Sequence, residues 1–147
     1  MRVPHAIDVA ISRQAWRDPG MVAWKQILNG IEIPPLTLFA TPDRMQRTWD
    51  MVATGGFVED PQFCMVRREV DLASADDPRL VLARTLFVGG STIPGDDVLV
   101  AVEDVAAEPG RVVVFDWARP IPTRWAPVMT VEEFCDAIAA YGSHISA

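Results

Sequence analysis

Histidines, cysteines and adjacent carboxylates are the side chains of this sequence whose types could support chemistry. His5 and His144 stand near opposite ends of the chain, and Cys64 and Cys135 are 71 positions apart. Nucleophilic catalysis needs a serine or cysteine beside a histidine base, and zinc sites use cysteines and histidines at short spacings. Neither spacing is present, so we expect no catalytic residue, no metal site and no cofactor.

Adjacent carboxylates and one glycine-rich stretch add no catalytic signature. Neighbours on a strand point to opposite faces, so Asp96-Asp97 and Glu103-Asp104 do not make an acid/base pair by themselves. Gly89–Gly95 lacks the Gly-Lys-Ser/Thr ending of a P-loop and the GxGxxG of a dinucleotide site, which favours a simple loop. Each cysteine lies in an apolar run, the setting of an inert buried thiol. The sequence therefore predicts a protein that is not an enzyme.

Composition predicts one soluble, acidic, globular domain. The chain has 147 residues, is 50% apolar and carries a formal net charge of −7, so a single domain over 1–147 is expected. Thirteen bases against 20 acids argue against a nucleic-acid binder. No run approaches the ~18 apolar residues of a membrane span. Asp8 and Arg13 interrupt the N-terminal apolar stretch, which argues against a signal peptide and for a cytoplasmic location.

The negative charge is concentrated in the middle of the chain. Residues 51–110 contain eleven acids and four bases. Such a segment is either a solvated face or a surface that attracts a basic partner over long range. On the second interpretation, the partner-facing residues are predicted to be Asp76, Asp77, Asp96 and Asp97.

Two of the five tryptophans are candidates for an interface. Trp117 and Trp125 bracket a proline-rich polar segment that contains Arg119 and Arg124. An exposed tryptophan beside arginine is typical of an interface anchor, and burial in the core is the alternative. Trp24 and Trp49 lie on apolar helical faces and are expected in the core.

Helices are predicted near both ends of the chain. Residues 6–17 fit either a strand or a helix, and a helix is favoured. A helix opened by Asp18 as its cap and Pro19 at its first position should run to about Leu28 and bury Met21, Trp24, Ile27 and Leu28. Thr41-Pro42-Asp43 should open another. Thr130 with Glu133 is a capping box for a final helix that ends at Gly142, followed by a frayed tail over 143–147.

Strands are predicted mainly in the second half. They are expected over 36–40, 63–70 and 80–88, the last being a strand or a short helix. The apolar run 97–102 predicts a central strand, and Glu108-Pro109-Gly110 turns the chain into its hairpin partner, 111–117. Consecutive strands with short turns favour an α+β fold, with a mixed, mostly antiparallel central sheet flanked by helices.

The chain also resembles a known superfamily. WKQILNG, LTLFA and TPDRMQRTWDMV, within 24–52, are similar to the first half of SUKH domains. GDDVLVAVED (95–104), GRVVVFDWA (110–118) and APVMTVEEFCDAI (126–138) resemble their ending. The resemblance implies an α+β domain with a central sheet, without cofactor or enzymatic role. Bacterial members are implied to be immunity proteins that neutralise a cognate toxin, and fungal relatives are linked to cell-wall synthesis.

The leading hypothesis is a protein-binding domain that acts as an immunity protein against a basic toxin. One alternative is a small-molecule-binding domain or enzyme with a pocket lined by Trp117, Trp125 and nearby arginines. The other is a subunit that acts by homo-oligomerisation.

Overall fold

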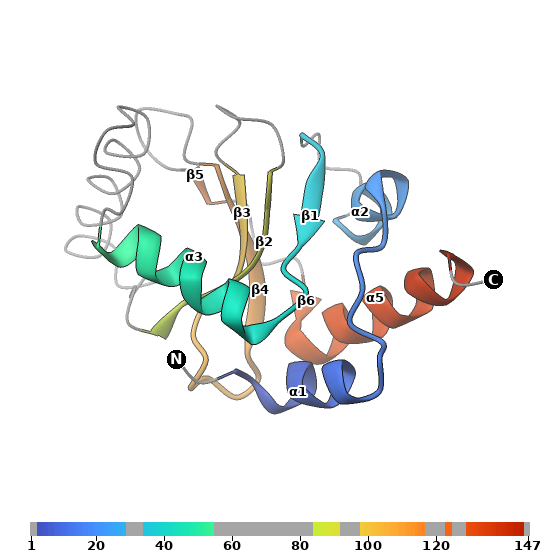
Figure 1. Ribbon diagram of the computed structural model, residues 1–147, viewed down its shortest axis with the longest axis horizontal. Helices are drawn as coiled ribbons and strands as arrows, with labels where there is room; N and C mark the ends of the chain where they lie inside the picture. Colours follow the sequence, from blue (N-terminus) through green and yellow to red (C-terminus); the bar gives the residue numbers. More distant parts are fainter. Residues whose placement is uncertain are drawn as a thin grey trace.

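The computed structural model describes residues 3–28, 34–54, 84–91, 98–116, 123–124 and 129–145 (Figure 1). Within them the elements, in chain order, are α1 (His5–Ser12), α2 (Met21–Ile27), β1 (Leu36–Leu38), α3 (Pro42–Thr54), β2 (Leu86–Ser91), β3 (Val98–Val102), β4 (Arg111–Asp116), β5 (Thr123–Arg124), β6 (Met129–Thr130) and α5 (Val131–Ile145). The strand expected over 63–70 lies outside the described residues.

The described strands form one sheet in the order β1-β2-β3-β4-β5, with β6 also paired to β4. Each of these pairings is antiparallel. The hairpin of β3 and β4 runs in register from Val98 opposite Asp116 to Val102 opposite Val112. The expected α+β class is confirmed, as is the central position of β3.

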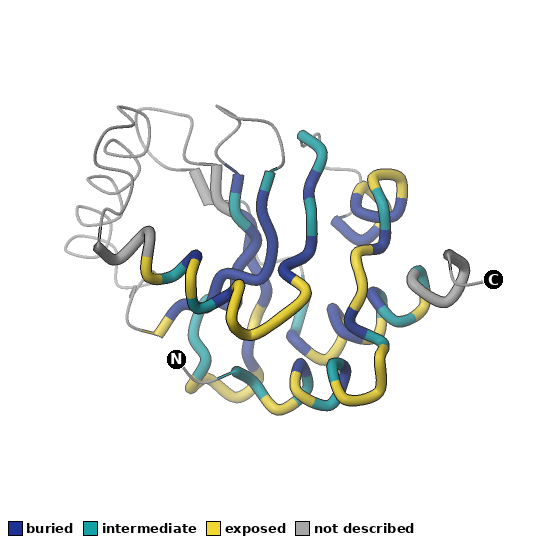
Figure 2. The backbone as a smooth tube through the Cα atoms, viewed as in Figure 1, coloured by how far each residue is buried: buried dark blue, intermediate teal, exposed yellow. Residues whose placement is uncertain are grey.

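The sheet and its helices share one apolar core. Helix α3 packs against β2, α1 and α2 pack against α5, and α5 contacts β4 and β6. Figure 2 shows β2 and β3 buried along most of their length, while the exposed residues follow the helices and turns. In β3 the side chains of Val100, Ala101 and Val102 are fully buried. The apolar run in the sequence therefore marks a strand covered on both faces, as predicted.

Three aromatic rings join the helices at the centre of this core. The Phe134 ring centroid on α5 lies 6.0 Å from that of Trp16 and 6.0 Å from that of Trp24 on α2. Trp16 follows α1 and donates its Nε1–H to the carbonyl oxygen of Phe39 at 2.8 Å. The Trp16 indole is thus buried with its N–H paired. Trp24 is confirmed in the core, and Trp49 packs half-buried against it.

The helix starts show both confirmed and wrong predictions. The helix favoured over 6–17 is present but spans only 5–12, and the Thr41 Oγ1 accepts from the N–H of Arg44 at 3.2 Å at the start of α3. Asp18 does not cap α2, because the helix begins at Met21 and its N-cap is Gly20. Gly20 has a φ of 92°, a conformation that favours glycine.

Two further boundaries differ from expectation. Gly89 and Gly90, expected in a loop, belong to β2, which extends to Ser91. A Cβ at Gly89 would lie 3.0 Å from the Thr37 carbonyl oxygen, so the absence of a side chain lets β1 and β2 approach closely. Helix α5 does not stop at Gly142 but continues to Ile145. Glycine in a helix interior costs only about 1 kcal/mol relative to alanine, so Gly142 does not by itself end the helix.

The capping box of α5 is present as predicted. The N–H of Glu133 donates to Thr130 Oγ1 at 3.2 Å, and the N–H of Thr130 donates to Glu133 Oε1 at 3.4 Å. Both donors would otherwise lack an intrahelical acceptor. Val131, Phe134, Cys135 and Ile138 form the buried face that follows, with Tyr141 half-buried.

Replacing Thr130 by alanine is expected to lower the free energy of unfolding by about 1 kcal/mol, because the N–H of Glu133 loses its acceptor. Urea denaturation followed by circular dichroism would measure the change. Thr130→Ser keeps the hydroxyl and serves as the control. An equal loss in both variants would contradict a role for the hydroxyl group.

Candidate functional site

The six residues predicted to face a partner all lie outside the described residues: Asp76, Asp77, Asp96, Asp97, Trp117 and Trp125. Their grouping on one surface remains a prediction. Within the described part of the chain, the exposed apolar surface lies elsewhere, at the start of α2.

An apolar groove lies between the start of α2 and the C-terminal half of α5. Its volume is about 320 Å³. Its lining residues are Pro19, Gly20, Met21, Val22, Ala23, Gln26 and Tyr141. Met21 and Val22 are 60% and 71% exposed, and they are the large apolar side chains exposed among the described residues. Adjacent exposed apolar residues beside a hollow are typical of an interaction surface.

The buried face of α2 explains why these two residues are exposed. Ala23, Trp24, Ile27 and Leu28 are buried, so the centre of the buried face lies on the side of α2 away from Val22. Met21, expected on that face, lies at its margin and is exposed. The burial of Ala23 turns the centre of the buried face away from Met21.

The Asp18 carboxylate organises the wall of the groove formed by α2. Its Oδ1 accepts from Trp24 Nε1 at 2.9 Å and from the N–H of Leu38 at 2.8 Å. Its Oδ2 accepts from the N–H of Gly20 at 3.3 Å. The carboxylate thus contacts α2, β1 and the turn between Asp18 and α2, where the sequence predicted only a helix cap.

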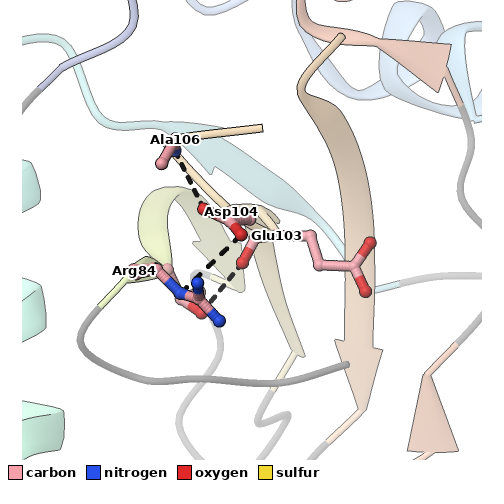
Figure 3. A network of polar contacts seen from close by, with 5 residues as sticks. Arg84, Glu103, Asp104 and Ala106 are labelled. Atoms are coloured by element: carbon pink, nitrogen blue, oxygen red, sulfur yellow. Dashed lines mark hydrogen bonds and ion pairs between the residues drawn. The ribbon is translucent and has the colours of Figure 1, made fainter. Parts of the chain in front are cut away.

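Part of the acidic middle segment forms a structural network at the turn between β3 and β4 (Figure 3). Arg84 Nε lies 3.7 Å from Asp104 Oδ2, and Asp104 Oδ1 accepts from the N–H of Ala106 at 2.9 Å. The buried Thr85 hydroxyl donates to the Glu103 carbonyl oxygen at 3.2 Å. The Glu103 carboxylate points away from Arg84 in Figure 3. Asp104 therefore orders this turn, and its partly exposed ion pair contributes little to stability.

Cys135 is a buried free thiol, as the sequence predicted. Burial is the largest cause that raises the pKa of Cys135 from 9.0 to about 12, and the nearby carboxylates of Asp136 and Glu132 contribute to the same rise. The thiolate, which is the reactive form, is therefore scarce at neutral pH. Among the residues that the structure describes, no three histidine, cysteine or acidic side chains gather as a metal site would require.

The Cys135 thiol is expected to react slowly with a disulfide reagent in the folded chain at pH 8, and rapidly after denaturation. In a chain with Cys64 replaced by serine, the reaction reports on Cys135 alone. Because folding raises the pKa of the Cys135 thiol, the thiol of the unfolded chain loses its proton at a lower pH than the thiol of the folded chain. The stabilising effect of the protonated thiol is thus complete below about pH 9 and is lost as the pH rises towards 12. Fast modification of the native chain at pH 8 would contradict this account.

None of the described helices is long and apolar enough to cross a membrane. The fold and the groove together define an α+β domain with one antiparallel sheet and an apolar surface at the margin of a helix. Comparison with family models, curated proteins and solved structures gives no match.

Proposed function

We propose that this chain is a cytoplasmic, non-enzymatic protein-binding domain that acts as an immunity protein and neutralises a cognate toxin. The observation that carries the proposal is the exposed pair Met21 and Val22 at an apolar groove closed on its other side by Tyr141. Exposure of large apolar side chains to water is unfavourable in free energy for a monomer, and a partner that covers these side chains removes this cost. The sequence resemblance to SUKH domains supplies the class of partner.

Two features of the groove suit a protein partner. Its lining is predominantly apolar, and it includes Gln26 and Tyr141, two side chains that carry polar atoms. Interfaces concentrate their binding energy in a few such anchors surrounded by polar residues. The net charge of −7 favours a basic toxin, since opposite charges accelerate encounter.

The test is co-expression with the polypeptide encoded beside this chain in its native host. We expect wild-type chain to restore growth of cells that make that polypeptide and to bind it in a purified two-component assay. Val22→Asp places a charge in the groove and should weaken binding roughly 30-fold or more, the effect of losing an anchor worth about 2 kcal/mol. Ala107→Asp adds the same charge at an exposed turn and is the matched control.

The outcomes separate the parts of the proposal. If Val22→Asp abolishes growth rescue and Ala107→Asp preserves it, both the immunity function and the role of the groove are supported. If both variants preserve growth rescue, the immunity function is retained, but the groove is not its binding surface. Neither rescue nor binding by the wild-type chain overturns the immunity function.

The acidic residues are assigned a separate role in this proposal, that of steering the partner. Replacing Asp76, Asp77, Asp96 and Asp97 by asparagine should slow association and flatten its dependence on salt, because long-range attraction is lost. Stopped-flow or surface-binding kinetics at several ionic strengths would measure both. An unchanged association rate would exclude steering by these carboxylates.

A further inference from the structure

The carboxylate of Asp18 is a polar junction between α2, β1 and the turn before α2. It receives hydrogen bonds from the Trp24 indole of α2, the Leu38 amide of β1 and the Gly20 amide at the start of α2. We propose that Asp18 is a latch that fastens the N-terminal turn of α2 to β1, and that this latch opens as a local unit without unfolding of the sheet. The inference concerns the movement of the groove wall and does not depend on what binds there.

The backbone geometry of β1 explains why a side chain is needed at this point. In an antiparallel pair, successive residues alternately direct their backbone groups towards and away from the neighbouring strand. Phe39 donates its N–H to the Val88 carbonyl oxygen at 2.8 Å and therefore faces β2. Leu38 is adjacent in sequence, so its N–H faces the opposite way, and Asp18 Oδ1 accepts it.

The same oxygen satisfies a buried donor on α2. The Trp24 side chain is 1% exposed, so its Nε1–H needs an acceptor within the protein. Asp18 is itself exposed, so water reaches the carboxylate when α2 moves away. One exposed group thus holds two donors on two elements, and α2 and β1 lie next to each other in Figure 1.

Other contacts hold β1 and the core without Asp18. Trp16 Nε1–H donates to the Phe39 carbonyl oxygen at 2.8 Å, and the Phe39 amide is paired with Val88. The Trp16 ring also packs on Phe134 of α5. Opening of the latch therefore releases the α2 turn that carries Gly20, Met21 and Val22, while β1 stays in the sheet.

Hydrogen exchange measured by NMR on the full chain tests the latch. It compares the exchange rates of two protons that are bonded to Asp18 with those of two protons that are not. The Leu38 amide and the Trp24 indole N–H are bonded to Asp18, whereas the Phe39 amide and the Trp16 indole N–H are not. In Asp18→Ala we expect the first pair to exchange at least 10-fold faster and the second pair to change less than 3-fold. Asp136→Ala removes the same charge from an exposed position of α5 and should leave both pairs unchanged.

Two outcomes overturn the proposal. Equal acceleration of all four protons in Asp18→Ala would show that the carboxylate supports the whole domain rather than a local unit. No acceleration would show that it protects neither donor. If Asp18→Ala does not fold, hydrogen exchange of the wild-type chain is measured instead, at low denaturant concentrations where the chain stays native. The Asp18-bonded pair must then share an equilibrium constant for opening that is more than 10-fold larger than that of the other pair. Equal constants for the two pairs overturn the latch.

Discussion

Replacing Phe134 by alanine is expected to lower the free energy of unfolding by about 3–5 kcal/mol, a large fraction of the stability of a domain of this size. The Phe134 side chain is fully buried, and its ring lies 6.0 Å from each of two indoles, centroid to centroid. Its removal leaves a cavity where α2, α5 and the segment after α1 meet. Urea denaturation followed by far-ultraviolet circular dichroism would show a lower midpoint with an unchanged slope.

Met21→Ala is the matched control, because it also shortens a large apolar side chain but at a position that is 60% exposed. It should change the free energy of unfolding by less than about 0.5 kcal/mol. A loss below about 1 kcal/mol for Phe134→Ala would mean that the helices do not depend on this ring for their attachment to each other.

Gly89→Ala is expected to cost about 1–3 kcal/mol, the usual penalty for adding an atom to a packed interior. The new Cβ would lie 3.0 Å from the Thr37 carbonyl oxygen, a backbone atom of the β1–β2 ladder that cannot turn aside. It would also meet the Trp24 ring at 3.6 Å. The strands must separate locally, which weakens their pairing. Thermal and urea unfolding of the variant would measure the loss.

Gly90→Ala is the comparison that isolates the cause. Its Cβ would meet the ends of the Leu99 and Phe39 side chains at 3.2 and 3.3 Å, and side-chain ends shift more easily than backbone. The entropic gain from restricting the unfolded chain, about 0.4–1 kcal/mol, is common to both variants and does not separate them. Because only the side-chain contacts at Gly90 can relax, Gly90→Ala should cost clearly less than Gly89→Ala. Equal losses would contradict the assignment of the clash to the Thr37 carbonyl oxygen.

Much of the sheet could be predicted because its signals are local. The apolar run of β3 and the turn at Glu108-Pro109-Gly110 together specify a hairpin, and the structure contains that hairpin in a single register. Thr130 and Glu133 specify the start of α5 for the same reason, since both partners of the capping box lie within one turn. Hydrogen bonds between near neighbours need no knowledge of the rest of the fold.

The errors arose where distant residues decide the local structure. Gly89 and Gly90 are typical of loops in sequence, but here their missing side chains leave room for Trp24, Phe39 and the backbone of β1. Asp18 beside Pro19 is typical of a helix cap, yet its shortest hydrogen bonds are accepted from the N–H of Leu38, 20 residues away, and from the Trp24 indole. No pattern within a window of a few residues contains that information.

The candidate site was missed for a related reason. The groove joins residues 19–26 to Tyr141, which are more than a hundred positions apart. Periodicity along α2 placed Met21 on the buried face, and only the packing of the whole helix shows that Met21 and Val22 are left outside. The acidic and tryptophan residues singled out from the sequence lie outside the described residues and keep the status of predictions.

The outer side of β1 has a consequence for handling and redesigning this protein. The Leu38 N–H faces away from β2 and donates to the carboxylate of Asp18. Free backbone groups along a sheet margin are templates for aggregation, and here a side chain occupies a position that a strand from another molecule would use. A version of the chain trimmed to begin after Asp18 would lose this protecting group. We therefore expect such a version to aggregate more readily at high concentration, so the residues before α2 should be retained in any shortened or fused form.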